Sequence, residues 1–276
     1  MILSGKAKLA GVLGWPVGHS RSPRLHGYWL DRLGIDGTYV PLPVAPENFE
    51  KVFRALPAMG FRGANVTVPH KEQALRLADE VEVLARRIGA VNTLVCRDDG
   101  SVLGLNTDAF GFLRNLQTGS TWQAGQGPAV VLGAGGAARA VVAALVDEGV
   151  GEIRLVNRSV ERAEKLAADI GGPIIVQSWD KLDLDGAGLL VNTTSLGMAG
   201  QPALDIDLSA LPKQAVVNDI VYAPLMTPLL LAAQARGNPV VDGLGMLLFQ
   251  AVRGFGLWFG VEPQVTQDLR DFVLSS

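Results

Sequence analysis

Short apolar runs alternate with stretches of helical periodicity along most of the chain. Residues 8–13, 129–132 and 189–192 are runs of mostly apolar side chains, which predicts buried strands. Between such runs, apolar residues recur three and four positions apart, which predicts helices that cover the strands. This alternation is typical of an α/β fold with mostly parallel sheets. The same pattern predicts further strands at residues 38–44, 64–68, 91–95, 153–156, 215–219 and 239–241.

The first predicted helix has recognisable ends. Ser22 belongs to the residue types that cap helix N-termini, Pro23 is favoured at the first helical position, and Gly34 suits a helix C-terminus. The periodicity between these ends places apolar side chains on one face, which we expect to be buried. That face comprises Leu25, Tyr28, Trp29 and Leu33.

The length of 276 residues corresponds to two domains at roughly 150 residues each. Residues 117–128 are mostly small or polar, which predicts a loop or a joint between domains. From Gly243 onward the pattern becomes helical, and the pattern alone leaves open which domain these helices join. We therefore expect two α/β domains followed by a helical segment.

Composition excludes several classes of protein. Hydrophobic residues make up 48% of the chain and charged residues 18%, which builds a core and excludes intrinsic disorder. The 24 basic residues are scattered and the net charge is −3, which disfavours nucleic-acid binding. No unbroken apolar run reaches the ~20 residues of a membrane span. A single cysteine, Cys96, cannot form an intrachain disulfide, so we expect a soluble cytoplasmic protein with no nucleic-acid or membrane partner.

A glycine-rich turn joins the predicted strand 129–132 to a helix of small residues. Its sequence, Gly-Ala-Gly-Gly-Ala-Ala over residues 133–138, matches the dinucleotide motif G-x-G-x-x-A in its strand–turn–helix setting. Gly133 permits the tight turn, Gly135 lets a pyrophosphate approach the backbone, and Ala138 keeps the helix close to the sheet. The free N–H groups at the helix start can bind the phosphates. A plain tight turn is the alternative, and the flanking elements favour a cofactor site.

The end of the next predicted strand indicates which dinucleotide binds. NAD-binding versions of the motif carry an acidic residue about 20 residues past the glycines, which binds the ribose hydroxyls. Here Asn157 holds that position, and Arg158, Ser159 and Arg162 follow it. Two guanidinium groups can bind a 2′-phosphate. Incidental arginines at a solvated helix start are the alternative, and the pattern favours NADP over NAD.

The first half of the chain carries polar residues where a core would need apolar ones. Ser20 and Ser22 lie two residues apart in the turn after the first predicted strand. Ser22 alone could be a helix cap, but Ser20 has no such explanation. Asn65 and Thr67 point to one side of their strand by the alternation of strand side chains. Lys71 then begins a helix, where a cation opposes the helix dipole, and such misfits concentrate at functional sites.

Further polar side chains each have a structural alternative. Two Asn-Thr pairs, at residues 92–93 and 106–107, add polar groups at predicted strands or turns, and Asp108 follows the second pair. Asp108 could simply cap a helix, Tyr222 could be a packing aromatic, and Gln250 could be an exposed helical residue. The three histidines lack the spacing and carboxylate partners of metal ligands, so we expect no metal site.

In combination, these segments resemble the shikimate dehydrogenase family, and the resemblance runs almost from end to end. Agreement in order across both halves of the chain is far more specific than any single motif. In the order of the chain, the matching segments are HSRSP, NVTVPHK, GAVNTL, GLNTDAFGF, GAGGAARA, NRSVERA, NTTSLGM, NDIVYAP and DGLGMLLFQA.

The resemblance implies NADP-linked interconversion of 3-dehydroshikimate and shikimate, with Lys71 and Asp108 as the acid–base pair beside the reacting carbonyl. Which of the two formally carries the proton stays open. Ser20 and Ser22 would hold the substrate carboxylate, and the other implied substrate residues are Asn65, Thr67, Asn92, Tyr222 and Gln250. The implied cofactor residues are Gly133, Ala134, Gly135, Gly136, Ala137, Asn157, Arg158, Ser159, Arg162, Thr193, Val221 and Gly243.

The resemblance also implies a division of the chain. Residues 1–108 would form the substrate domain, residues 109–242 a Rossmann domain for NADP, and residues 243–276 would pack back on the first domain. Closure of the cleft between the domains would exclude water during hydride transfer. A homodimer is compatible with this picture.

Two departures from the family pattern leave the implied chemistry untouched. His26 is followed by Gly27 where the family often has asparagine, and Ser159 replaces a common threonine. Two alternatives stay open: an enzyme of broader range that also takes quinate or an amino analogue, and a non-catalytic NADP-binding sensor. A methylene dehydrogenase acting on a folate is a third candidate, which the hydroxyl pair and the Lys71–Asp108 set disfavour.

Overall fold

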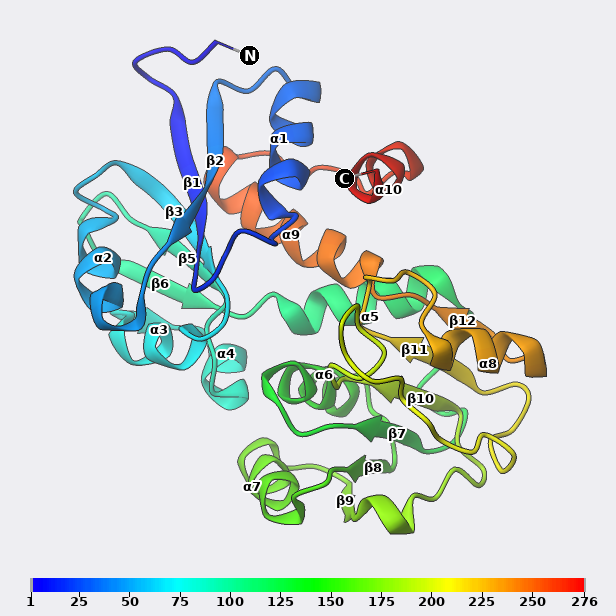
Figure 1. The fold of residues 1–276 in the computed structure, drawn as a ribbon. Coiled ribbons are helices and arrows are strands. Elements are labelled where there is room, and N and C mark those ends of the chain that lie inside the picture. Colours follow the sequence, from blue (N-terminus) through cyan, green and yellow to red (C-terminus); the bar gives the residue numbers. More distant parts are fainter. Residues whose placement is uncertain (1, 276) are drawn as a thin grey trace. The chain divides into compact units, whose positions relative to one another are not determined.

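The computed structural model describes residues 2–275, which form two compact units (Figure 1). The first unit contains the chain up to Thr107 together with the segment from Leu248 onward. The second unit is Asp108–Leu247. Each unit has its own six-stranded sheet with helices, which confirms the predicted α/β fold with mostly parallel strands.

The sheet of the first unit has the strand order β2-β1-β3-β5-β6-β4. The central β1 pairs with β2 and β3 in parallel, whereas β5 is antiparallel to both β3 and β6. The short β4 pairs with β6 in parallel. The bounds are β1 (Lys8–Gly14), β2 (Gly37–Pro43), β3 (Phe61–Val66), β4 (Glu80–Val81), β5 (Thr93–Cys96) and β6 (Val102–Leu105).

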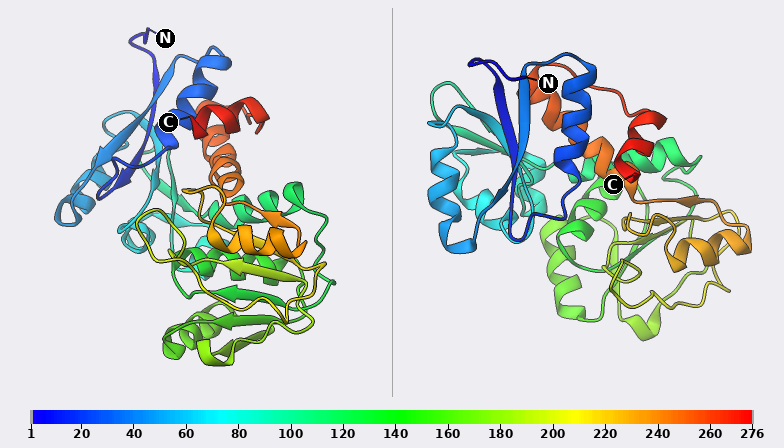
Figure 2. Two further views of the ribbon diagram at one scale, coloured as in Figure 1. Left: turned by 45° about the vertical axis from the view of Figure 1, so that its right-hand side comes forward. Right: turned by 45° about the horizontal axis from the view of Figure 1, so that its top comes forward.

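Helices cover both faces of this sheet (Figures 1 and 2). On one face, α2 and α3 enclose a cluster that includes the fully buried Phe49 and Phe53. On the other face, α1 and the C-terminal part of α9 bury the aromatic rings of Trp29, Phe255 and Trp258. The bounds are α1 (Ser22–Arg32), α2 (Phe49–Ala55), α3 (Lys71–Leu77), α4 (Val83–Ile88), α9 (Leu244–Phe259) and α10 (Gln267–Leu274).

The ends of α1 differ from the prediction. Arg21 is the N-cap residue, and no side chain caps the helix, so the capping prediction for Ser22 is wrong. Ser22 is instead the first helical residue, and its hydroxyl is left for other contacts. Leu33, predicted to be on the buried face, follows the helix and is 45% exposed, while Leu30 is buried in the core. Gly34 ends the segment with φ +61°, as predicted for a helix C-terminus.

The sheet of the second unit is parallel throughout, with the order β12-β11-β10-β7-β8-β9. Its central strands are buried on both faces, as the continuous apolar runs in their sequences require. The strand bounds are β7 (Ala129–Leu132), β8 (Ile153–Val156), β9 (Ile174–Gln177), β10 (Leu189–Asn192), β11 (Val216–Asp219) and β12 (Val240–Val241), and the helices are α5 (Asp108–Gly119), α6 (Gly136–Asp147), α7 (Val160–Ile170) and α8 (Pro228–Arg236).

The polar segment 117–128 lies within the second unit. Its first three residues belong to α5, and a loop from Ser120 to Pro128 connects α5 with β7. The predicted loop is therefore present, but the two units divide at Thr107 rather than in this segment. Among the described residues, no helix is long and apolar enough to cross a membrane.

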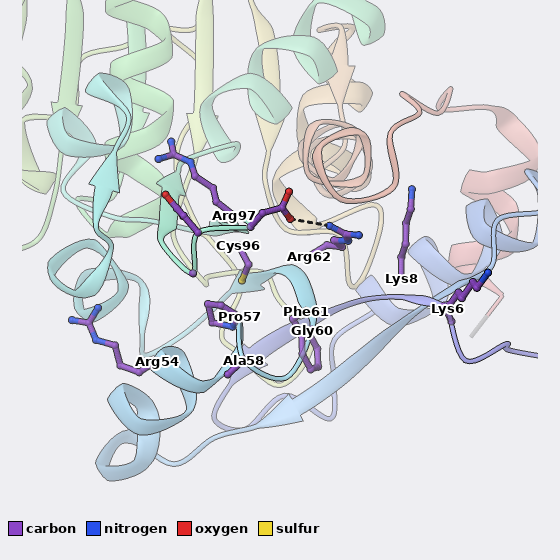
Figure 3. A pocket seen from close by; sticks show the side chains of 14 residues that line it. Lys6, Lys8, Arg54, Pro57, Ala58, Gly60, Phe61, Arg62, Cys96 and Arg97 are labelled. Carbon is purple, nitrogen blue, oxygen red and sulfur yellow. Dashed lines mark ion pairs between the residues drawn. The ribbon is translucent and has the colours of Figure 1, made fainter.

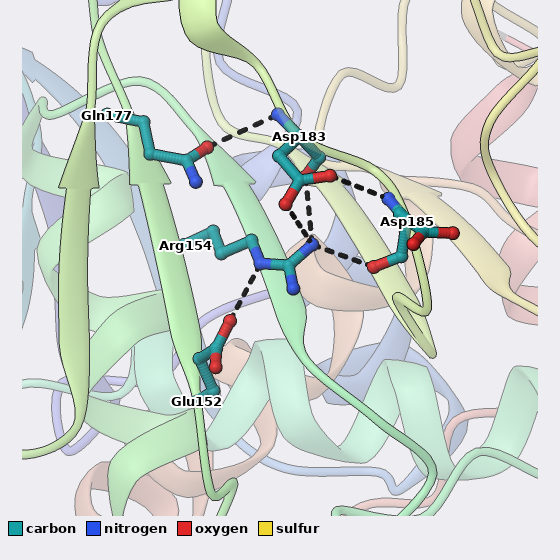
Figure 4. A network of polar contacts seen from close by, with 5 residues as sticks. All are labelled: Glu152, Arg154, Gln177, Asp183 and Asp185. Atoms are coloured by element: carbon teal, nitrogen blue, oxygen red, sulfur yellow. Dashed lines mark hydrogen bonds and ion pairs between the residues drawn. The ribbon is translucent and has the colours of Figure 1, made fainter.

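A largely buried arginine connects two parts of the second unit (Figure 4). Arg154 on β8 forms ion pairs with Glu152, at 2.7 Å, and with Asp183, at 3.1 Å. It also donates to the backbone oxygen of Asp185 at 2.8 Å. Because the Arg154 side chain is only 13% exposed, these charge-assisted contacts anchor the loop before β10 to strand β8.

Candidate active site

Polar residues gather at one edge of the sheet in the first unit. The carboxyl ends of β1, β3 and β6 meet at this edge, and the antiparallel β5 begins there. Segments at the carboxyl ends of parallel strands are the usual place for ligands in α/β sheets. Ser20 and Ser22 follow β1, Thr67 and Lys71 follow β3, and Asn92 precedes β5.

The two serines of the turn after β1 differ in burial. Ser22 is 7% exposed, whereas Ser20 is partly exposed. The backbone N–H of Ser22 donates to the hydroxyl oxygen of Ser20 at 3.3 Å, which holds the two residues close together. The Ser22 side chain lies beside the hydroxyl of Tyr39 and offsets part of the rise in the Tyr39 pKa that burial causes.

The end of β3 presents the next group of residues. Asn65 lies on β3 and is buried, while Thr67 lies just past the strand end at Val66. A Cβ added to Gly14 would lie 2.5 Å from the Cγ2 atom of Thr67, so the glycine at the end of β1 leaves the space that Thr67 fills. Lys71 is the first residue of α3, as predicted from the sequence. Its side chain is partly exposed.

Asn92 and Gln250 are linked through Thr107. The Asn92 side chain donates to the Thr107 hydroxyl at 3.1 Å and accepts from the Thr107 backbone N–H at 2.8 Å. The Thr107 hydroxyl lies 3.4 Å from Oε1 of Gln250 on α9. Gln250 is only 8% exposed, which excludes the alternative that it is a surface residue. Side chains 143 positions apart in the chain thus share one buried network.

Three members of this network were not predicted as site residues. Thr93 accepts from Nδ2 of Asn65 at 3.2 Å and donates to Oδ1 of Asn92 at 2.9 Å, so it joins the two asparagines. Thr107 performs the same function between Asn92 and Gln250, and Tyr39 contacts Asn65. The two Asn-Thr pairs were visible in the sequence as polar residues at strand or turn positions. Tyr39 carried no signal, because a tyrosine in an apolar strand is usually a packing residue.

The glycine turn of the second unit has the geometry that its motif predicts. Gly133 adopts φ +106°, and an added Cβ would lie 2.8 Å from the hydroxyl oxygen of Thr193. That hydroxyl donates to the backbone oxygen of Leu132 at 2.6 Å, so Thr193 packs against the start of the turn. Gly135 is the N-cap residue of α6, and an added Cβ there would meet no atom within 4 Å. The open side of the turn at Gly135 therefore has room for a phosphate.

A cavity of about 860 Å³ opens beside this turn. Arg158 and Arg162, both exposed, lie in its lining. The side chain of Asn157 also lines it and donates to the backbone oxygen of Ser159 at 2.7 Å, which fixes the strand end. Of the predicted cofactor residues, the lining contains Gly133, Ala134, Gly135, Asn157, Arg158, Arg162 and Thr193; unpredicted lining residues include Trp179, Thr194, Ser195 and Gln201.

Five predicted cofactor residues are not in this lining: Gly136, Ala137, Ser159, Val221 and Gly243. The first two begin α6 directly after the lining residues. The Ser159 hydroxyl donates to the Glu161 carboxylate at 2.9 Å. Gly243 has a structural reason to be glycine, because an added Cβ would collide with the backbone of Ile220.

Two predicted residues of the substrate and catalytic groups belong to the second unit. Asp108 is the first residue of α5, and Tyr222 follows β11. Both are partly exposed. Among the described residues, no group of three or more metal-ligating side chains is present.

The first unit also has a cavity, of about 620 Å³, which is lined by several cationic side chains (Figure 3). Arg62 is paired with Asp98 at 3.6 Å, and Arg97 with Glu80 at 2.7 Å. The guanidinium groups of Arg54 and Arg97 do not point toward a common point (Figure 3). Burial raises the pKa of the Cys96 thiol to about 11, so this lining residue is an unreactive thiol at neutral pH. The cationic side chains therefore do not converge on a ligand.

The fold and these two groups of residues define an α/β protein with one unit for a dinucleotide and one polar site for a small ligand. Residues 12–94 match the family model of the shikimate dehydrogenase substrate-binding domain. Residues 119–195 match the model named shikimate/quinate 5-dehydrogenase.

Known proteins are similar over nearly the whole chain. A shikimate dehydrogenase (NADP(+)) of Paramagnetospirillum magneticum is 67% identical over 99% of this chain and 100% of its own length. The crystal structure of shikimate 5-dehydrogenase from Thermus thermophilus, in complex with NADP(H) and shikimate, has a TM-score of 0.86 at 38% identity, covering 97% of this chain and 99% of that chain. Quinate dehydrogenase from Corynebacterium glutamicum, in complex with NAD, has a TM-score of 0.91 at 33% identity, covering 98% of this chain and 99% of that chain. The chain belongs to the shikimate dehydrogenase family, which confirms the resemblance seen in the sequence.

Proposed function

We propose that this protein catalyses the reversible, NADPH-dependent reduction of 3-dehydroshikimate to shikimate. The observation that carries the proposal is the buried network at the sheet edge of the first unit, where Asn65, Asn92 and Gln250 are held by hydrogen bonds. This network lies in the segment that matches the substrate-binding domain of the family, apart from its members at the end of β6 and on α9.

The residues at this edge suit a small polyhydroxylated anion. Hydroxyl groups such as those of Ser20 and Ser22 donate to a carboxylate without introducing a fixed positive charge. Amide side chains such as those of Asn92 and Gln250 both donate and accept, which matches the ring hydroxyls of the substrate. Thr67 and Tyr222 complete the proposed substrate set.

The cavity of the second unit fits NADP. The open space at Gly135 and the N-terminus of α6 suit the pyrophosphate, and Arg158 and Arg162 suit the 2′-phosphate. Gly133, Ala134, Asn157 and Thr193 form the rest of the proposed wall. When bound, NADPH supplies the hydride, and the protein positions the substrate and manages the proton.

Lys71 and Asp108 are the proposed acid–base pair. During reduction, a charged Lys71 polarises the substrate carbonyl and its Nζ atom donates a proton to the oxygen. During oxidation, the neutral Nζ atom removes that proton from the hydroxyl. Asp108 is the second member of the proposed pair and takes part in the same proton exchange.

A direct assay tests the proposal. Purified protein with shikimate and NADP⁺ is expected to produce the near-ultraviolet absorbance of NADPH, and quinate in place of shikimate measures the breadth of the substrate range. Absence of turnover with either nicotinamide cofactor would contradict the enzymatic function and favour a binding protein. The single cysteine, which is free, is in keeping with a cytoplasmic location. The mass of the protein in solution tests whether it forms a homodimer.

Replacement of Arg158 and Arg162 by alanine tests the cofactor preference. Loss of two charge-assisted contacts to the 2′-phosphate is expected to raise the KM for NADP⁺ by at least about 10-fold. The KM for NAD⁺, which lacks that phosphate, should change little. Arg114→Ala, at an exposed arginine of α5, is the control. Equal effects on both cofactors would assign the two arginines a structural function instead.

A further inference from the structure

A buried tyrosine of β2 contacts two of the proposed substrate residues. Tyr39 is 5% exposed, and its hydroxyl donates to Oδ1 of Asn65 at 2.6 Å. The Ser22 side chain lies beside the same hydroxyl. One phenol therefore joins the turn after β1 to the side chain presented by β3.

The strand register explains why only a long side chain can make this connection. Strand β1 separates β2 from β3, so Tyr39 must reach across two strand spacings, or about 10 Å. Tyr39 pairs with Ala10, and Asn65 pairs with Val12. Ala10 and Val12 are two residues apart, so all four side chains share one face of the sheet. The small side chain of Ala10 leaves room for the phenol ring between β2 and β3.

A histidine of α1 holds the ring of Tyr39. The ring centroids of His26 and Tyr39 are 4.0 Å apart, with an interplanar angle of 6°. Burial lowers the pKa of His26 to about 3, so the stacked imidazole is neutral at ordinary pH. Ser22 and His26 are four residues apart and share one face of α1. One turn of this helix thus contacts Tyr39 at both its ring and its hydroxyl.

The hydrogen-bond capacities of these groups assign the donors. The phenol has one proton, which it donates to Asn65, so its oxygen can only accept from the neighbouring Ser22 hydroxyl. Because Oδ1 of Asn65 accepts, its Nδ2 atom donates to the backbone oxygen of Asn92 and to Thr93. This fixes the orientation of the Asn65 amide. If the Ser22 proton turns toward a carboxylate, the phenol proton can turn to the Ser22 oxygen in its place.

We propose that Tyr39 is a positioning residue for the substrate, which acts through Ser22 and Asn65. This inference rests on the proposed function, because it needs the substrate carboxylate at Ser22. A phenylalanine would fill the same space and keep the stacking on His26. Only the hydroxyl, which is hydrogen-bonded to Asn65 and lies beside Ser22, distinguishes positioning from packing.

Tyr39→Phe is the variant that tests this inference. Loss of the buried hydroxyl, with its hydrogen bond to Asn65 and its contact with Ser22, is expected to raise the KM for shikimate by about 10-fold. The kcat and the KM for NADP⁺ should stay within about twofold of the parent values. Tyr28→Phe makes the same chemical change on α1, where the ring packs against Phe272, and is expected to leave all constants unchanged. His26→Phe retains a stacked ring and should also retain the KM for shikimate.

Two further measurements separate positioning from a general loss of structure. Ser22→Ala and Tyr39→Phe combined should raise the KM for shikimate by less than the product of the single effects, because both changes remove the same contact between the two hydroxyl groups. The methyl ester of shikimate lacks the carboxylate charge. Tyr39→Phe should therefore raise the KM for the ester less than it raises the KM for shikimate.

The outcomes distinguish this inference from the proposed function. An unchanged KM for shikimate in Tyr39→Phe, fully multiplicative effects in the double variant, or an equal fall in kcat would overturn the positioning function alone. Absence of shikimate turnover in the parent protein would overturn the proposed function as well. A lower melting temperature in Tyr39→Phe without a change in KM would assign the hydroxyl to stability.

Discussion

At the scale of single residues, Lys71 carries the most specific chemical expectation. It is a partly exposed lysine at the start of a helix, where its charge is unfavourable for the helix dipole. Lys71→Ala is expected to lower kcat by at least 10²-fold, the usual contribution of a general acid or base, while binding of NADP⁺ is unchanged. Turnover with shikimate and titration of cofactor fluorescence measure the two effects.

Lys51→Ala provides the matched control for Lys71. Lys51 is an exposed lysine of α2 in the same unit, so its removal changes the net charge equally. Near-normal turnover of Lys71→Ala would remove Lys71 from the proposed acid–base pair. A similar loss in both variants would indicate an effect of overall charge.

His26 makes a prediction about stability and pH. Its pKa lies at about 3 in the folded protein and near its ordinary value of 6.5 in the unfolded chain, because burial disfavours the charged imidazole. Between these pH values unfolding takes up a proton, so the free energy of unfolding falls as the pH drops. The slope approaches ~1.4 kcal/mol per pH unit.

His26→Phe should remove this contribution and keep the aromatic packing with Trp29, Phe255 and Trp258. Urea unfolding at several pH values between 4 and 7, about the range of the shift, measures the free energy in both proteins. The free energy of unfolding is expected to fall less steeply toward low pH in the variant than in the parent. The difference in slope should correspond to the uptake of one proton on unfolding. Parallel curves would show that His26 is accessible to protonation in the folded state.

At the scale of elements, two glycines of the turn between β7 and α6 have different functions: one permits the backbone conformation, and the other leaves space for the ligand. Gly133 has φ +106° and lies against Thr193, so Gly133→Ala is strained by both its backbone and its neighbour. Gly135 has φ −91° and open space around an added Cβ. We expect Gly133→Ala to lower both the melting temperature and NADP⁺ affinity, the strain being of the order of 1–3 kcal/mol.

Gly135→Ala should keep the melting temperature and lower NADP⁺ affinity alone, because the methyl group occupies the space proposed for the pyrophosphate. Thermal unfolding without ligand and calorimetric titration with NADP⁺ distinguish the two variants. Equal NADP⁺ affinity in Gly135→Ala and the parent would contradict the proposed phosphate position.

At the scale of the whole molecule, the two units should respond to different ligands. NADP⁺ alone is expected to slow hydrogen exchange in peptides that contain β7, the glycine turn and the start of α6. Shikimate alone should slow exchange in peptides around Ser22, Asn65 and Asn92. At about 100 times its Kd, either ligand adds ~2.7 kcal/mol of stability to the unit that it binds. Protection by NADP⁺ limited to the first unit would contradict the assignment of the two sites.

The local elements were predictable to different degrees. Strands β7, β8 and β10 agree with the prediction residue for residue, because buried parallel strands are continuous apolar runs. Strands β4, β6 and β9 were missed. Strand β4 has only two residues and β6 contains a glycine, so neither forms a clear apolar run, whereas the apolar run of β9, IIVQ, was overlooked. The start of α1 was misplaced by one residue, since a serine at the first helical position has the same sequence signature as a serine cap.

What the sequence by itself determined is the set of local features that a few neighbouring residues encode. The glycine turn between a strand and a helix, the arginines after β8 and the ordered motifs of the family all lie in continuous segments. A turn with φ above zero favours glycine wherever it occurs, so the glycines in the sequence predict the turn.

Only the tertiary structure decided which polar side chains meet. The strand order β2-β1-β3-β5-β6 is not the order of the chain, so Tyr39 reaches Asn65 across β1, and Thr107 meets Gln250 from α9. Periodicity shows which face of a strand is buried, but not which strands are neighbours. Nothing in the sequence therefore marked Tyr39 as a site residue, and its hydrogen bond to Asn65 and its contact with Ser22 became visible only in the folded sheet.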